Sequence, residues 1–194
     1  MEVSHVQRIA RVLNALVIAA LICNIVILYL VPAAVLSGGP GLLEGVGTYL
    51  GGIVFPGEDD IVAAGILGSA LAWLWFWQDA DSMVLTLFLT VSGICTATIL
   101  WQGRRVLGTI LRGEPFSAEN AVSLRRAAVC SFVIAGAALV RVVFNLVRFR
   151  SVAPLLSYNA LFVPIFAMAG LLCLVMSALF RQAAEIKAEN DLTI

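Results

Sequence analysis

The polar residues best placed to do chemistry in this sequence lie inside long apolar stretches. Arg141 is the strongest case, because it stands 15 residues into the apolar stretch that begins at Ala127, and Asn145 follows four residues later on the same helical face. An ionisable side chain inside a membrane is costly and often marks a binding or transport pathway. Arg141 and Asn145 are therefore candidates for holding an anion or a lipid headgroup.

A structural role for Arg141 is the alternative. A long arginine side chain can reach back to the membrane interface and pair there with an acidic residue. Asp79 and Asp81 are the candidate partners, and Arg148 is a second basic residue on the face of Arg141. This interpretation predicts that the acidic segment folds over the third and fourth apolar stretches.

Residues for metal or nucleophile chemistry are sparse. The only histidine is His5, and the four cysteines, Cys23, Cys95, Cys130 and Cys173, are isolated with one in each long apolar stretch. No metal-ligand spacing results, and buried cysteine behaves as a small apolar residue. A carboxylate relay is disfavoured as well, because Asp, Glu and Lys are absent from the middles of these stretches. We therefore expect no catalytic residue, no metal, no cofactor and no enzyme.

The elements that carry these residues follow from composition. The chain has 194 residues, of which 61% are hydrophobic and 12% are charged, against about a quarter charged in an ordinary soluble domain. This composition excludes a water-soluble fold. Lys plus Arg and Asp plus Glu number 12 each, so no net charge attracts nucleic acid, and direct binding to DNA or RNA is not expected.

Four stretches have about the 20 apolar residues that a bilayer span requires. The predicted fold is an all-α integral membrane protein with four transmembrane helices in a single membrane domain over residues 1–194. The spans cover about residues 9–31, 83–101, 127–147 and 161–180.

The basic residues set the expected orientation, because loops rich in Lys and Arg stay in the cytoplasm. Nine of the 12 basic residues lie on one side of the predicted spans: Arg8, Arg11, Arg104, Arg105, Arg112, Arg125, Arg126, Arg181 and Lys187. Both termini, the loop 104–126 and the tail 181–194 are therefore expected in the cytoplasm. Residues 32–82 form the outer segment.

The outer segment combines a glycine-rich part with a fifth apolar run, Ile61 to Trp77. A fifth span would break the charge pattern, so we expect a short helix at the outer membrane surface, with its tryptophans in the interfacial belt. A re-entrant segment and a fifth span remain the alternatives.

The loop 104–126 begins with apolar residues at helical spacing, which predicts that the second helix continues past the membrane. Gly113 and Pro115 should end that helix, and Ser117 is a candidate N-cap for the next one. The two helices and the loop 104–126 would form a helical hairpin, and the basic residues of the loop would anchor it at the lipid headgroups. The alternative is that the loop is a docking surface for a cytoplasmic protein.

Two short motifs occur at characteristic places relative to the predicted spans. Gly113-Glu114-Pro115-Phe116-Ser117 lies between the second and third spans, and the chain ends on Glu189-Asn190-Asp191-Leu192-Thr193-Ile194. With these motifs the sequence resembles a bacterial family of four-span membrane proteins, domain of unknown function 2975, over roughly Val84 to Ile194. The resemblance says little about the longer outer segment from Leu36 to Gln78.

The resemblance implies no reaction, because members of the family have no established activity. It does imply a candidate partner, because members are commonly encoded beside a small Cro/C1-type helix-turn-helix regulator. The leading hypothesis is a non-enzymatic sensor or anchor in the bacterial inner membrane that binds such a regulator on its cytoplasmic face. The candidate partner-binding residues are Gly113, Pro115, Phe116, Ser117, Glu189, Asn190, Asp191, Leu192, Thr193 and Ile194. The alternative is a small transporter or a lipid- or anion-binding protein that uses Arg141 and Asn145. Membrane lipid and a second copy of the chain are further expected partners.

Overall fold

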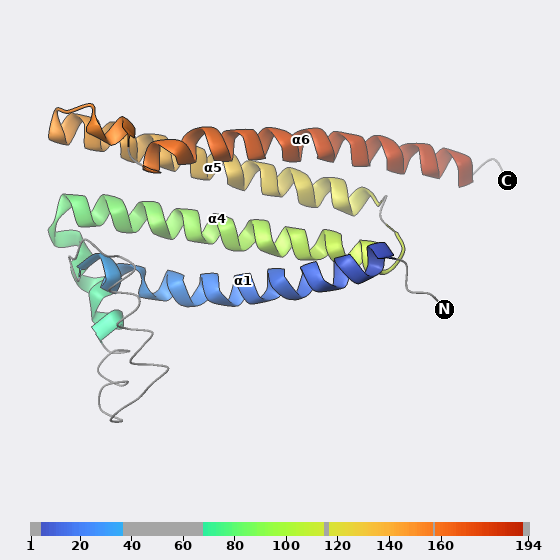
Figure 1. The fold of residues 1–194 in the computed structure, drawn as a ribbon, viewed down its shortest axis with the longest axis horizontal. Coiled ribbons are helices and arrows are strands. Elements are labelled where there is room, and N and C mark those ends of the chain that lie inside the picture. The colour runs from blue at the N-terminus through green and yellow to red at the C-terminus, as the bar shows by residue number, and fades with distance from the viewer. Residues whose placement is uncertain (1–4, 37–67, 115–116, 157, 192–194) are drawn as a thin grey trace, which may run out of the picture. The chain divides into compact units, whose positions relative to one another are not determined.

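Four long apolar helices make up most of the chain: α1 (His5–Leu36), α4 (Ala80–Leu111), α5 (Ala118–Phe149) and α6 (Tyr158–Asp191) (Figure 1). The computed structural model describes residues 5–36, 68–114, 117–156 and 158–191. Each helix contains one predicted span and is long and apolar enough to cross a membrane. A helix of 32 residues, such as α4, rises about 48 Å and so exceeds the roughly 30 Å hydrocarbon core. The described chain is all-helical and has the helices of a four-span, multi-pass membrane protein.

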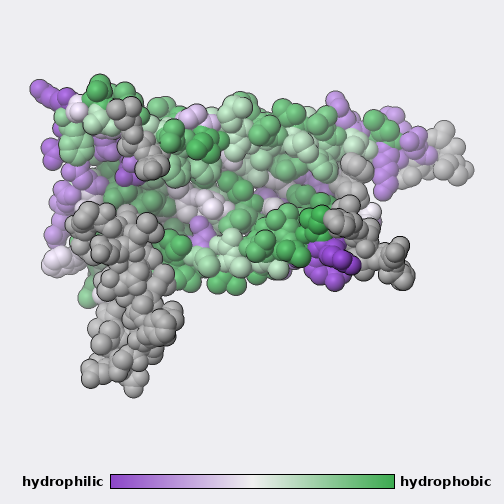
Figure 2. All heavy atoms as spheres, in the orientation of Figure 1, coloured by the Kyte–Doolittle hydropathy of each residue, from purple (hydrophilic) through white to green (hydrophobic). Residues whose placement is uncertain are grey.

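The surface of the helices is as apolar as a lipid environment requires. Large hydrophobic side chains such as Val140 and Leu172 are 68% and 62% exposed. Figure 2 shows hydrophobic residues along the lengths of the helices and hydrophilic residues gathered mainly at their ends. Lipid tails can cover this surface, whereas water would leave it unstable.

α1 is longer than the first predicted span, which ended at Val31. The helix continues to Leu36, with Pro32 inside it. A proline in a helix interior costs about 3 kcal/mol, so packing must offset it. Pro32 is fully buried, and Ala33 and Ala34 are 3% and 5% exposed. The helix therefore continues five residues past the predicted span, because tertiary burial outweighs the cost of the proline. The start of the outer segment at residue 32 stays a prediction.

The chain divides into two compact units, Asn24–Gly93 and Met1–Cys23 with Ile94–Ile194. Within the first of these, the indole Nε1 of Trp73 donates a hydrogen bond to the Tyr29 carbonyl oxygen at 3.3 Å. Gly93 lets α1 and α4 approach closely, because a Cβ there would lie 2.7 Å from Cδ1 of Leu28. Small residues serve the same purpose at many membrane helix contacts.

The aromatic segment of this unit is helical over residues 68–75 and continues as the 3₁₀-helix η1 (Phe76–Gln78). Phe76 is buried, whereas Trp75 and Trp77 are 61% and 59% exposed. A helix at the membrane surface stays a prediction, since residues 61–67 and the glycine-rich residues 37–57 lie outside the described part.

In the other unit, α5 and α6 pack side by side, joined by a turn that contains the 3₁₀-helix η2 (Ala153–Leu156) (Figure 1). The buried face of α5 carries small residues at helical spacing: Ala127, Ala128, Ser131, Ala135 and Ala138. Small side chains let helix backbones approach closely in a membrane. On α6 the same role falls to Gly170, where a Cβ would lie 3.0 Å from the ring of Phe132 on α5.

Candidate functional site

The turn that joins α4 to α5 is built around Gly113, as the sequence predicts. Gly113 has a φ of +83°, which a residue with a side chain adopts only with strain. Its backbone N–H donates to the Ile110 carbonyl at 3.1 Å, and the Glu114 N–H donates to the Thr109 carbonyl at 3.0 Å. These two bonds form a Schellman motif, which satisfies the last carbonyls of α4. Pro115, the second expected helix breaker, lies outside the described residues.

Ser117 holds the N-cap position of α5, but its side chain forms no capping hydrogen bond. The Ser117 carbonyl instead accepts a 3.0 Å bond from the backbone N–H of Asn120. The predicted position of the cap is right, and its predicted side-chain bond is wrong, because the Ser117 hydroxyl oxygen is buried without a partner among the described residues.

A buried hydrogen bond fixes α4 against α5 just below the turn. The Thr109 hydroxyl shares its proton between Asn120 Oδ1 at 2.9 Å and the Val106 carbonyl oxygen at 2.7 Å, and Thr109 and Asn120 are only 3% and 1% exposed. A buried polar pair of this kind is stable only when both groups find their partners. The bond sets the level at which the first turn of α5 faces the end of α4.

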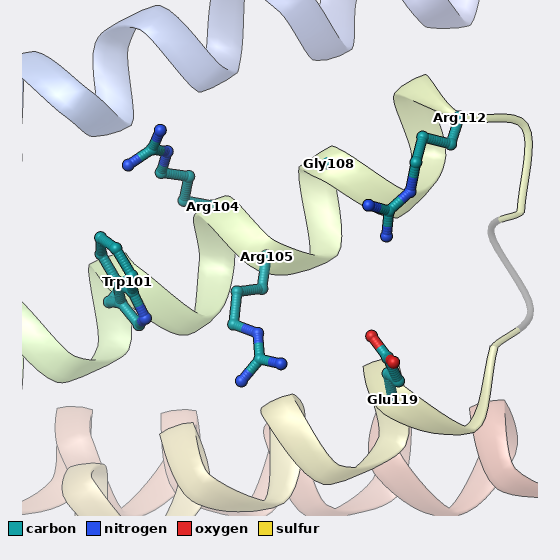
Figure 3. A pocket seen from close by; sticks show the side chains of 6 residues that line it. All are labelled: Trp101, Arg104, Arg105, Gly108, Arg112 and Glu119. Carbon is teal, nitrogen blue, oxygen red and sulfur yellow. The ribbon is translucent and has the colours of Figure 1, made fainter.

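A pocket of about 350 Å³ opens at this level between α4 and α5 (Figure 3). Its α4 side is lined by Trp101, Arg104, Arg105, Gly108 and Arg112, and its α5 side by Glu119. Trp101, Arg105, Gly108 and Arg112 are separated by four, three and four residues, and Arg104 stands three residues after Trp101 and four before Gly108, so they share one helical face. Gly108 leaves the middle of that face open, because a Cβ there would meet nothing within 4 Å.

The pocket is strongly cationic, with three guanidinium groups and one carboxylate. The Cζ atom of Arg104 lies 5.4 Å from the centroid of the Trp101 ring, which is a cation–π contact. Figure 3 shows Arg105 and Arg112 extending from α4 toward the side where Glu119 rises from α5. Within the described residues, no ion pair occupies the guanidinium of Arg105 or Arg112. Two arginine side chains therefore keep their donors available to an anion.

All residues that line this pocket lie within the part of the chain that matches a known protein family. The family described as "Protein of unknown function (DUF2975)" matches residues 67–194, about two thirds of the chain. The chain belongs to this family. The match begins at residue 67 rather than Val84, so it includes the aromatic residues 68–78 about which the resemblance was expected to say little. No curated protein and no solved structure matches the chain.

The predicted partner-binding residues of this DUF2975 protein lie in the turn and at the end of α6. Gly113 is exposed in the turn, and Glu189 and Asn190 are exposed on the last turn of α6, where Asp191 is the final helical residue. Ser117 is half-buried at the N-cap of α5, and the other five predicted residues lie outside the described part: Pro115, Phe116, Leu192, Thr193 and Ile194. Partner binding by this set stays a prediction.

Arg141 and Asn145 lie half-buried on α5. The Nη1 of Arg141 donates a 2.8 Å hydrogen bond to Oδ1 of Asn159, near the start of α6. The sequence interpretation missed Asn159, because an amide at the beginning of an apolar stretch carries no signal of its partner. This bond links α5 to α6.

The three residues that were predicted to form outer ion pairs lie at helix ends. Asp79 caps α4, since its Oδ2 accepts bonds from the backbone N–H and the hydroxyl of Ser82 at 3.1 and 3.2 Å. Asp81 lies in the first turn of α4, and Arg148 lies in the last turn of α5. An ion pair between these acids and Arg141 or Arg148 stays a prediction.

The sequence interpretation did not predict the pocket lined by Arg104, Arg105 and Arg112. Its arginines were expected to anchor the hairpin separately at the headgroups. The steps of three and four residues from Trp101 to Arg112 were visible in the sequence. The placement of Glu119 was not, because it depends on the bond between Thr109 and Asn120.

Proposed function

We propose that this membrane protein is a non-enzymatic sensor or anchor that presents its cytoplasmic end to a protein partner, for which a small Cro/C1-type helix-turn-helix regulator is the leading candidate. The observation that carries this proposal is that α6 extends well beyond the helix it packs against. In Figure 1 the last turns of α6 lie past the end of α5.

One hydrogen bond between α5 and α6 allows the length of this extension to be worked out. The Ser177 hydroxyl donates to the Ala121 carbonyl at 2.7 Å, which places these two residues at the same level. From Ser177, α6 continues for 14 residues to Asp191, or about 21 Å. From Ala121, α5 extends only three residues back to Ala118, or about 4 Å. The end of α6 therefore projects about 16 Å past α5.

The projecting helix has the surface of a segment in water. Arg181 and Glu185 form an ion pair at 3.0 Å, with side chains that are 75% and 60% exposed. Such an exposed pair adds little stability, but it marks a solvated helix. Ile186 is 59% exposed among these polar neighbours and offers one apolar contact for a partner. A short helix with charged groups around an apolar residue suits a small protein surface better than a lipid surface.

The cytoplasmic placement of this end rests on charge. Arg104, Arg105, Arg112, Arg125 and Arg126 all belong to the part of the chain around the α4–α5 turn. Basic residues near span ends favour the cytoplasmic side, which for a bacterial inner-membrane protein is also where a DNA-binding regulator resides. A sensor would additionally need two packings of differing affinity for the regulator.

The alternative of transport or anion binding at Arg141 receives less support. The guanidinium of Arg141 already donates to Asn159 across the α5–α6 contact. This bond supports a role in joining the two helices.

The test measures binding between the purified full-length chain, held in lipid nanodiscs, and the purified regulator encoded beside it. We expect saturable binding that is lost in a chain without residues 189–194 and weakened by Ile186→Glu. Val152→Glu is the matched control, because Val152 is 70% exposed in the turn at the opposite end of α5. Equal binding by all four proteins, or none by the full-length chain, would contradict the proposal.

A further inference from the structure

We propose that the arginine pocket, defined by Trp101, Arg104, Arg105, Gly108, Arg112 and Glu119, binds the phosphate group of an anionic membrane phospholipid. This inference goes beyond the proposed function and needs no protein partner. The carrying observation is a pocket of about 350 Å³ that gathers three arginines and one acid where the predicted second span ends.

The depth of the pocket matches that of lipid headgroups. Trp101 ends the predicted second span, and tryptophan prefers the boundary between hydrocarbon and headgroups. Arg105 lies four residues further along α4, or about 6 Å, and Arg112 lies eleven residues further, or about 16 Å. The headgroup layer on each side of a bilayer is roughly 5 to 8 Å thick. Arg105 therefore stands at the level of the phosphates, and Arg112 can close over a headgroup from the water side.

The chemistry of the lining favours a phosphate. Guanidinium groups donate paired hydrogen bonds to phosphate oxygens, and such charge-assisted bonds are about twice as strong as neutral ones. Arg105 and Arg112 have no ion pair within the described residues, so binding a phosphate breaks no existing one. Arg104 is held over the Trp101 ring and adds positive potential beside it.

The balance of charge favours an anionic lipid over a zwitterionic one. Three arginines and Glu119 leave the pocket with an excess of two positive charges. A zwitterionic headgroup brings its own cation into this field, whereas a phosphatidylglycerol headgroup does not. Glu119 opposes the phosphate, so its removal should strengthen binding.

A lipid source fits the site better than free phosphate. The pocket begins at an aromatic residue of the hydrocarbon boundary, and acyl chains beneath a bound headgroup can cover exposed apolar residues of α4 such as Ile94, which is 53% exposed. Inorganic phosphate would gain none of this burial.

The test uses the full-length chain, purified in a mild detergent and mixed with equal amounts of phosphatidylglycerol and phosphatidylcholine that carry the same acyl chains. Native mass spectrometry gives the ratio of the two lipids bound. We expect a clear preference for phosphatidylglycerol, and a drop in that preference of about tenfold or more in Arg105→Gln/Arg112→Gln, since hydrogen bonds to charged groups are involved.

Three further variants separate the pocket from general surface charge. Arg125→Gln/Arg126→Gln removes two exposed arginines of α5 that do not line the pocket, and should change the preference less than about threefold. Gly108→Leu keeps every charge and fills the open centre of the pocket, so it should lower the preference as the arginine variant does. Glu119→Gln should raise it. Should the arginine variant fail to fold, Gly108→Leu carries the test of the pocket.

Two results would overturn the proposal. An equal loss in the Arg125/Arg126 control would show a general attraction to basic helix ends, and an unchanged preference in both the arginine and the Gly108→Leu variants would show that the pocket holds no lipid. In a parallel arm, displacement of phosphatidylglycerol by inorganic phosphate at the same concentration as the lipid would assign the site to free phosphate and reject the lipid. No regulator is present in these samples, so their outcome is independent of the protein-partner test.

Discussion

The close contact between α5 and α6 at Gly170 gives the sharpest prediction about the fold. In Gly170→Ala, the new Cβ would lie 3.0 Å from Cε1 and Cζ of Phe132 and 3.1 Å from Cε2. Carbon atoms prefer separations of about 3.5 to 4.0 Å, so the ring or the helix must move by roughly 0.5 Å. The added methyl group therefore strains three atom pairs at once.

Two opposing terms set the size of the effect. Overpacking of this kind costs about 1 to 3 kcal/mol, whereas alanine gains up to about 1 kcal/mol over glycine inside a helix. The net result should be a loss of about 1 kcal/mol in the free energy of unfolding. Gly136→Ala on α5 is the matched control, because a Cβ there meets nothing within 4 Å and only the helical gain remains.

The assay is equilibrium unfolding of the purified chain in mixed micelles with increasing fractions of a denaturing detergent, followed by circular dichroism. Gly170→Ala should unfold earlier than the unchanged chain, and Gly136→Ala at the same point or later. Phe132→Leu should recover part of the loss when combined with Gly170→Ala, because it removes the ring atoms in contact. Equal stability of the two alanine variants, or no recovery with Phe132→Leu, would refute the proposed packing.

Three further predictions concern single contacts, each measured by the same unfolding assay. Gly113→Ala should lower the free energy of unfolding by about 1 kcal/mol, because the φ of +83° in the α4–α5 turn suits only glycine; an unchanged value would contradict the Schellman turn. Asn120→Ala should cost about 1 kcal/mol by removing the bond from the Thr109 hydroxyl, which keeps its bond to the Val106 carbonyl, and Thr109→Val in the same chain should add little further. Arg141→Leu and Asn159→Ala should each destabilise the chain and show a coupling of about 1 kcal/mol when combined; fully additive losses would show that the bond contributes nothing.

The parts of the fold that the sequence could predict are those with local causes. Hydropathy over about 20 residues marks a span wherever the helix packs, and all four spans were found in this way. The end of α4 at Gly113 was equally predictable, because only glycine adopts its backbone angle without strain. The extension of α1 beyond Pro32 was missed because burial from other segments outweighs the cost of the proline.

The candidate site shows the same division between local and tertiary causes. The face that joins Trp101 to Arg112 is a local pattern on one helix. Its conversion into a pocket needs Glu119 from another helix, at a level set by the bond between Thr109 and Asn120. Likewise, Arg141 was recognised as a costly residue in need of a partner, but its bond to Asn159 depends on which faces of α5 and α6 meet.

The sidedness of the two ends of α5 and α6 decides whether a cytoplasmic partner can bind, because the protein partner requires the end of α6 to lie in the cytoplasm. Single cysteines are placed by Glu189→Cys and Ser151→Cys in a chain whose four native cysteines are replaced by alanine, and cells are treated with a thiol reagent that does not cross membranes. We expect labelling of the Ser151 variant in intact cells and of the Glu189 variant only after the inner membrane is opened. Labelling of the Glu189 variant in intact cells would contradict this expectation.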